Sequence, residues 1–81
     1  MTDNRLKIFC TTADRLSFSA AAKTLGITQP AVTKQIAKLE EELGYALFIR
    51  ISKKVILTEK GSEFLKIAQE ILEKYREIDK I

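Results

Sequence analysis

Residues 18–48 have the sequence FSAAAKTLGITQPAVTKQIAKLEEELGYALF, which predicts two helices joined by a tight turn. The first helix would begin after Ser17, whose hydroxyl can accept hydrogen bonds from free backbone N–H groups, and would end at Gly26, which tolerates a left-handed conformation. Thr28 would cap the second helix, and Gly44 would end it. This is the layout of a helix-turn-helix unit, whose second helix enters the major groove of DNA.

The second of these helices separates its apolar side chains from its basic ones. At about 100° per residue, one narrow stripe holds the apolar residues that we expect in the core: Val32, Ile36, Leu39 and Leu43. The outward face and its flanks hold the polar and basic residues: Gln29, Pro30, Thr33, Lys34 and Lys38. An ordinary amphipathic helix with a solvated charged face shows the same pattern, so the helix alone does not separate the two interpretations.

Charge placement favours the DNA-binding interpretation. Residues 1–58 carry nine basic and five acidic side chains, whereas residues 59–81 carry five and six. Residues 15–39 contain four basic side chains and no acidic one, and residues 43–58 contain three and none. A positive surface confined to one part of the chain suits a polyanionic partner, because each neutralised phosphate releases counterions and adds affinity.

The length and composition exclude several other classes. At 81 residues the chain is long enough for one small helical core, which would gain stability from an additional interface. No stretch approaches the roughly 20 apolar residues of a membrane span and no signal-peptide pattern opens the chain, so we expect a cytoplasmic protein without a membrane partner. The chain has no histidine and one cysteine, Cys10, which we expect to be a small buried hydrophobe. We therefore expect no metal site, no cofactor and no enzymatic activity.

Two further elements are expected around the helix-turn-helix unit. A first helix over residues 3–15 should pack under it, because apolar residues recur at helical spacing: Leu6, Phe9, Cys10, Ala13 and Leu16. After the second helix, two short β-branched-rich runs, residues 46–51 and 55–57, surround the polar segment Ser52-Lys53-Lys54 and predict a β-hairpin. Such a hairpin would be a wing with its tip lysines near the DNA backbone or minor groove, although a solvated turn is the alternative.

The last predicted helix, residues 59–81, carries more apolar surface than a small core needs. Its apolar residues follow the 4, 3, 4, 3 spacing of a heptad seam, which two leucines widen: Phe64, Ala68, Ile71, Tyr75 and Ile78, with Leu65 and Leu72. At about 1.5 Å per residue the helix would be about 33 Å long. We therefore expect it to project and to form a homodimer with its own copy, the alternative being a helix folded wholly back on its own domain.

Taken together, these residues resemble the N-terminal region of the LysR-type transcriptional regulators. The matching stretches are residues 16–18, 21–22, 28–36, 39–44, 47–48 and 57–61, with Leu25 and Arg50 between them. The resemblance implies a mainly α, winged helix-turn-helix fold in residues 1–58, with three helices and a short β-hairpin wing, and a linker helix in residues 59–81 that pairs two subunits. In this family an effector-sensing domain follows, so the chain looks like an excised DNA-binding domain that would meet a small-molecule effector only through that missing domain.

The resemblance also implies which residues contact double-stranded DNA. The matching positions lie on the recognition helix, on the wing and at the start of the preceding helix: Gln29, Pro30, Thr33, Lys34, Lys53, Lys54, Ser17 and Ser19. Three further candidates cap or flank these positions: Thr28, Lys38 and Arg50. The family more often has arginine where this chain has Lys34, Lys53 and Lys54, and lysine makes a point-charge contact without arginine's two-pronged fit to guanine or phosphate.

We therefore expect a dimeric, sequence-specific DNA-binding domain of a bacterial-type transcriptional regulator. Two symmetric copies would place two recognition helices in successive major grooves of a partly palindromic operator. Two alternatives stay open on the sequence. One is the winged-helix domain of another regulator family, such as the molybdate-responsive regulators, and the other is a helical protein-interaction module that works through its long last helix.

Overall fold

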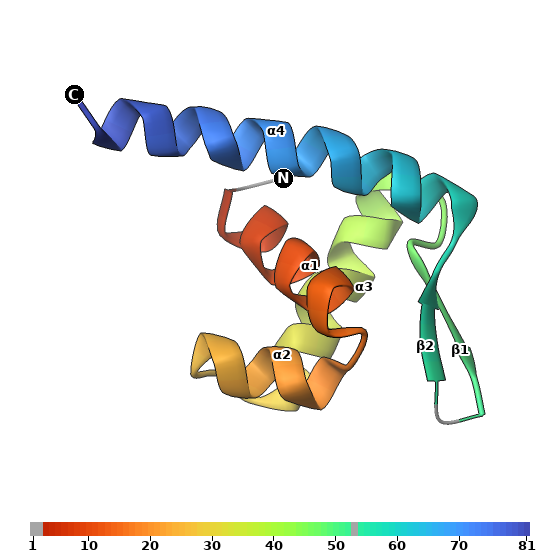
Figure 1. The fold of residues 1–81 in the computed structure, drawn as a ribbon. Helices are drawn as coiled ribbons and strands as arrows, with labels where there is room; N and C mark the ends of the chain where they lie inside the picture. Colours follow the sequence, from red (N-terminus) through yellow and green to blue (C-terminus); the bar gives the residue numbers. More distant parts are fainter. Residues whose placement is uncertain (1–2, 53) are drawn as a thin grey trace.

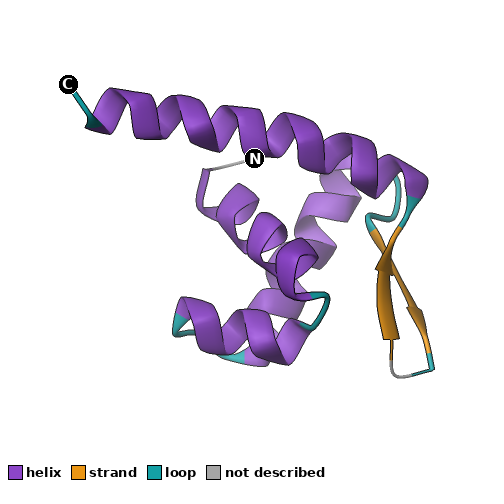
Figure 2. Cartoon of the chain, in the orientation of Figure 1, coloured by secondary structure: helices purple, strands orange, loops and turns teal. Residues whose placement is uncertain are grey.

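The computed structural model describes residues 3–52 and 54–81, which form four helices and one two-stranded hairpin. The elements in chain order are α1 (Asp3–Arg15), α2 (Phe18–Leu25), α3 (Gln29–Leu43), β1 (Phe48–Ile51), β2 (Lys54–Leu57) and α4 (Glu59–Asp79). In Figure 1, α1, α2 and α3 form one group, the hairpin stands beside them, and α4 runs across one end. Figure 2 shows the same mainly helical arrangement, which confirms the predicted winged helix-turn-helix fold.

The helices begin and end where the capping residues predicted. Ser17, Thr28 and Thr58 each accept a hydrogen bond from a backbone N–H in the following first turn, at 2.8–3.2 Å between the heavy atoms. At the other ends, Gly26 and Gly44 adopt left-handed conformations with φ of 69° and 81°. These caps leave a short turn between α2 and α3, as a helix-turn-helix unit requires.

α1 spans the predicted residues, but its buried face differs from the predicted one. Ile8 and Thr12 are buried, and the Thr12 hydroxyl donates to the Ile8 carbonyl at 2.7 Å, which satisfies a polar group inside the core. Leu16, predicted as a core residue, is 47% exposed, because the backbone turns into a left-handed conformation there (φ 50°) and the helix has ended. Cys10 is half-buried, not buried as predicted; burial raises the pKa of its thiol, and the charge of Arg76 opposes that shift.

Aromatic rings join the elements of the core. The ring of Phe9, on α1, lies 5.4 Å from that of Phe48 on β1 and 5.2 Å from that of Phe64 on α4, measured between centroids. Phe18, on α2, packs edge-on against Phe48 at 5.8 Å. Tilted and edge-on pairs at these distances are favourable. The wing and α4 are therefore attached to the helix-turn-helix unit through one continuous core.

The hairpin is shorter at its base than predicted and longer at its tip. β1 and β2 are antiparallel, and Lys54, predicted in the turn, pairs with Ile51 as the last pair before the tip. Leu47, predicted in the first strand, lies before it, because its N–H donates to the Glu40 carboxylate of α3 at 2.7 Å and its side chain is fully buried. The predicted role of Lys53 lies outside the described residues.

α4 packs on α1, and Ala68 and Leu72 of α4 are 1% and 8% exposed. It begins tightly against the loop before the wing, where the backbone N–H of Thr58 donates to the Leu47 carbonyl at 2.9 Å. The helix ends at Asp79, two residues before the predicted end. Over residues 3–52 and 54–81, none of the helices combines the length and apolarity needed to cross a membrane.

Candidate nucleic-acid interface

A cleft opens between the wing and the N-terminal ends of α2 and α3. It is lined by residues from all three: Leu16, Ser17, Phe18, Ser19, Gln29, Arg50, Ser52, Lys54 and Val55. Five of the predicted DNA-contacting residues meet in it: Ser17, Ser19, Gln29, Arg50 and Lys54. The structure thus places side chains that are far apart in the chain around one polar, basic hollow.

The N-terminus of α2 forms one wall of the cleft. The hydroxyls of Ser17 and Ser19 lie 3.2 Å apart there, and the first turn of α2 contains no acidic side chain. The unpaired N–H groups and the dipole at a helix N-terminus favour negative charge. This wall therefore suits a phosphate group.

Arg50 forms part of the opposite wall, on the face of the wing that turns toward α2. Its guanidinium carbon lies 4.2 Å from the centroid of the Phe18 ring. A guanidinium over an aromatic face is attracted by the ring and does not spend its N–H groups on a hydrogen bond. Stacking therefore holds the charge of Arg50 in place at the cleft without using its donors.

α3 presents its two predicted faces. Three residues of the predicted apolar stripe are buried, namely Val32, Ile36 and Leu39, whereas Leu43 is half-buried at the end of the helix. The outward residues are exposed: Gln29, Pro30, Thr33, Lys34 and Lys38. Thr33 and Arg50 line a second hollow, so Arg50 borders both the hollow of Gln29 and that of Thr33.

The remaining candidates are placed differently from the cleft residues. The Thr28 hydroxyl accepts the N–H of Ala31 as the α3 cap. Lys38 lines a separate hollow with Arg5 and two carboxylates, those of Glu41 and Glu42, and does not reach the cleft. Within residues 3–52 and 54–81, no group of three or more His, Cys, Asp or Glu side chains is placed to hold a metal ion.

Four residues that line the cleft were not predicted to do so: Leu16, Phe18, Ser52 and Val55. Leu16 was assigned to the core, because no glycine signalled the left-handed end of α1. Phe18 was not recognised as the ring that Arg50 stacks on, since that contact joins distant parts of the chain. Ser52 lines the cleft from the wing tip, where its backbone is left-handed with φ of 58°. Its position in a predicted hairpin turn was a signal for this conformation.

The predicted dimer seam on α4 divides into two sets. Four residues are buried or half-buried in the chain's own core: Phe64, Leu65, Ala68 and Leu72. Three are exposed, at 38%, 48% and 63%: Ile71, Tyr75 and Ile78. Ile67, which was not predicted, is 57% exposed four residues before Ile71. The exposed strip of α4, defined as Ile67, Ile71, Tyr75 and Ile78, is thus narrower than predicted and shifted around the helix, because α1 covers Ala68 and Leu72.

Known proteins share this sequence and this fold. The model of the bacterial regulatory helix-turn-helix proteins of the lysR family matches residues 4–62. The chain is 46% identical over 72 residues to the uncharacterized HTH-type transcriptional regulator YbhD of Escherichia coli (strain K12), and the match covers 89% of this chain and 23% of that protein.

Two solved structures that contain DNA are similar over almost the whole chain. The DNA-binding domain of BenM in its complex with benA site 1 DNA superposes with a TM-score of 0.94 and 35% identity, over 99% of this chain and 90% of that one. The DNA-binding domain of CbnR in complex with DNA superposes with a TM-score of 0.91 and 38% identity, over 99% and 93%.

The fold and the cleft, together with these matches, define a winged helix-turn-helix DNA-binding domain. The chain belongs to the LysR family of bacterial transcriptional regulators, which is not a class of enzymes. Neither the molybdate-responsive alternative nor the protein-interaction module is favoured. The chain spans about a quarter of the length of regulators such as YbhD.

Proposed function

We propose that this LysR-type DNA-binding domain reads its operator with the N-terminal half of α3 while the wing and the start of α2 hold the flanking phosphates. The observation that carries this proposal is the cleft, where Gln29 meets Arg50, Lys54 and the two serines of α2. A recognition helix needs base-reading side chains beside groups that fix its register on the phosphate backbone.

In this proposal the base contacts come from the exposed start of α3. Gln29 can offer its amide oxygen and NH2 together to the edge of an adenine, and Thr33 can offer a hydroxyl or a methyl group. Pro30 adds an apolar contact beside them. These three residues lie within about one turn, which matches the few base pairs that one recognition helix reads.

The phosphate contacts surround these base contacts. On one side they are the α2 N-terminus with Ser17 and Ser19, and on the other side Arg50 and Lys54 of the wing. Lys34 adds a charge from α3 itself, and Lys53 and Thr28 complete the proposed set. Such contacts set position and affinity, and they carry no sequence information directly.

Dimerisation is proposed through α4, with residues 1–58 as the winged helix-turn-helix unit and residues 59–81 as the linker helix. The exposed strip of α4 supports this, because four large apolar side chains on one helix face leave apolar surface in water. Two copies would place two α3 helices on a partly palindromic operator. We further propose that the whole protein regulates transcription in the bacterial cytoplasm and responds to an effector through the part that this chain lacks.

Replacing Gln29 with alanine tests the assignment of α3 as the reading element. The preferred duplex is first obtained by selection from random duplexes with this chain. Gln29→Ala is expected to weaken binding to that duplex by roughly 1–3 kcal/mol, while binding to random duplex barely changes. Gln69→Ala, the same change on exposed α4, is the control and should leave both affinities unchanged. An equal loss on both duplexes would show that Gln29 does not read sequence.

A further inference from the structure

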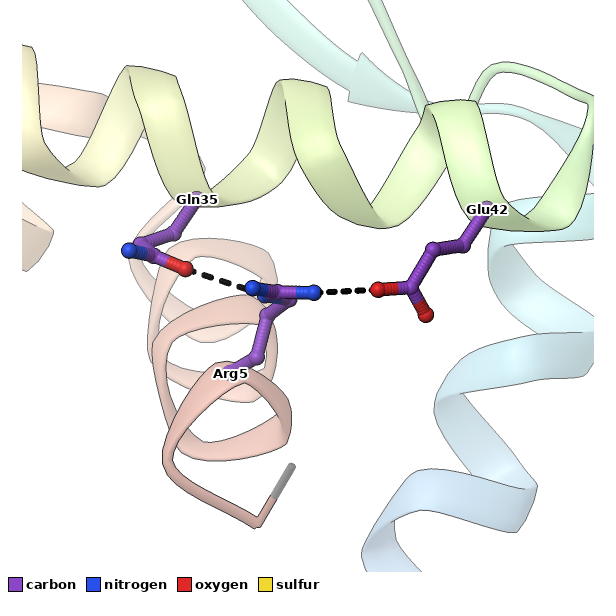
Figure 3. Close-up of polar contacts among 3 residues, drawn as sticks. All are labelled: Arg5, Gln35 and Glu42. Atoms are coloured by element: carbon purple, nitrogen blue, oxygen red, sulfur yellow. Dashed lines mark hydrogen bonds and ion pairs between the residues drawn. The ribbon is translucent and has the colours of Figure 1, made fainter. Parts of the chain in front are cut away.

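Arg5 links the first turn of α1 to the recognition helix. Its Nε donates to Oε1 of Gln35 at 2.9 Å, and its Nη1 forms an ion pair with the carboxylate of Glu42 (Figure 3). The Arg5 side chain is 16% exposed and its bond to Gln35 is partly shielded from water, whereas the Glu42 side chain is 41% exposed and the ion pair with it is open to solvent. A charged, partly buried hydrogen bond such as that to Gln35 is stronger than an exposed one, and the exposed ion pair with Glu42 adds less.

The two acceptors are placed so that one side chain holds α3 at two points. Gln35 and Glu42 are seven residues apart, which is two helical turns and about 10 Å along the axis on one face. The guanidinium is planar, and its donors have fixed directions. Contact at two such points resists both rotation of α3 about its axis and sliding along it.

The rest of the α1–α3 contact is apolar and contains no other side-chain hydrogen bond among the described residues. The buried side chains of Val32, Ile36 and Leu39 fix which face of α3 turns inward, and Arg5 adds contacts with defined directions to this packing. Thr33 and Lys34 directly precede Gln35 on the same rigid helix. Any rotation that Gln35 undergoes therefore also turns the outward side chains that face DNA in the proposed function.

We propose that Arg5 is a positioning residue for DNA reading: it sets the orientation of α3 so that Gln29 and Thr33 face the base edges. Arg5 acts through Gln35 and Glu42 and touches no DNA, because its hollow, shared with Lys38, is separate from the cleft. The inference rests on the proposed function of α3. It adds that sequence discrimination depends on a contact on the far side of the helix.

Arg5→Met tests the proposal, because methionine keeps an unbranched side chain and removes every donor. Affinity for the preferred duplex should fall roughly 3- to 30-fold, the range for residues that act through others. Affinity for random duplex and the salt dependence of binding should stay almost unchanged, since the variant keeps every proposed phosphate-binding group. Arg5→Lys keeps the charge but offers one donor group, so it should recover only part of the discrimination.

Two comparisons separate positioning from a merely structural role. All variants are assayed below their melting transition, so that loss of stability alone moves neither affinity. Lys74→Met removes an ion pair with Glu77 (3.1 Å) and the same charge from α4, and it should leave discrimination intact. Arg5→Met combined with Gln35→Leu should weaken discrimination little more than Arg5→Met alone, because the hydrogen bond of Gln35 to Arg5 is already absent in that variant.

The outcomes are distinct. Unchanged discrimination in folded Arg5→Met would overturn the proposal, and so would equal losses of affinity on both duplexes with a flatter salt dependence, which would make Arg5 a phosphate-binding residue. If Gln29→Ala relaxes specificity and Arg5→Met does not, only the positioning role fails. If Gln29→Ala has no effect on specificity either, the assignment of α3 as the reader fails first.

Discussion

Gly61 is the residue on which the junction between the wing and α4 depends. It lies in the first turn of α4 against the backbone of Leu47, and a Cβ built on it would overlap the Leu47 carbonyl oxygen. The same loop is held by Thr58, whose hydroxyl donates to the Ala46 carbonyl at 2.7 Å. Glycine is thus required here for close approach, and not for a left-handed backbone.

Gly61→Ala should lower the free energy of unfolding by about 1–3 kcal/mol, the usual cost of forcing an extra carbon into a packed site. The gain in helix propensity from alanine, up to about 1 kcal/mol, offsets only part of this cost. Urea denaturation of the variant and the parent measures the difference. Ser62→Ala, at the neighbouring exposed position, is the control and should stay within about 0.5 kcal/mol. Equal stability of Gly61→Ala would mean that the loop moves aside.

At the scale of the element, the wing has two unlike faces. Register pairs Arg50 with Val55 on the face toward α2, where Arg50 stacks on Phe18. The other face carries three exposed isoleucines and the last paired lysine: Ile49, Ile51, Ile56 and Lys54. The basic side chains of the wing therefore lie at its tip, as Lys54, and on the face toward α2, as Arg50. Both line the cleft together with Gln29 at the start of α3.

The wing should reveal its phosphate-binding role through the salt dependence of binding. Each phosphate that the protein no longer neutralises flattens the slope of log affinity against log salt by about 0.9. Replacing Lys53 and Lys54 by glutamine is expected to reduce that slope by between about one and two units, with similar decreases in affinity for preferred and random duplex. Lys66→Gln, on α4, is the control. A double variant with the parental slope and affinity would make the hairpin a solvated turn.

At the scale of the whole molecule, α4 extends the shape to 45 × 26 × 19 Å. Its first half is part of the domain core through Phe64 and Ala68, and in Figure 1 its C-terminal end extends beyond the other elements. The exposed strip of α4 continues along that end. The helix therefore packs into the domain core along one side and leaves an exposed apolar surface along another.

Ile71→Lys should convert the proposed dimer to monomers, because it places a charge in the middle of the exposed strip. Sedimentation measures the mass of each species. Binding to an operator with two half-sites should weaken far more than binding to one half-site, since paired domains gain effective concentration. Gln69→Lys adds the same charge to α4 outside the strip and should leave the dimer intact. A parent chain that stays monomeric at high concentration would refute dimerisation through α4.

Local signals in the chain were enough to predict the helices, all of their ends except that of α4, and the basic part of the sequence. Ser17, Thr28 and Gly44 act on backbone groups within a few residues of themselves, so their effect is visible in sequence order. The buried stripe of α3 was equally predictable, because a helix places every third or fourth residue on one side. The predicted DNA-contacting residues of the cleft followed from the resemblance in the same linear way.

Three-dimensional packing was needed for the contacts between elements. The heptad spacing of α4 marks an apolar face but cannot tell whether the chain's own core or a second copy covers it, which is why Ala68 and Leu72 were assigned to the seam. The stacking of Arg50 on Phe18 and the contacts of Arg5 with α3 join residues about 30 positions apart. Such pairs leave no periodic signal, because their distance in space depends on how whole helices pack and not on neighbours in the chain.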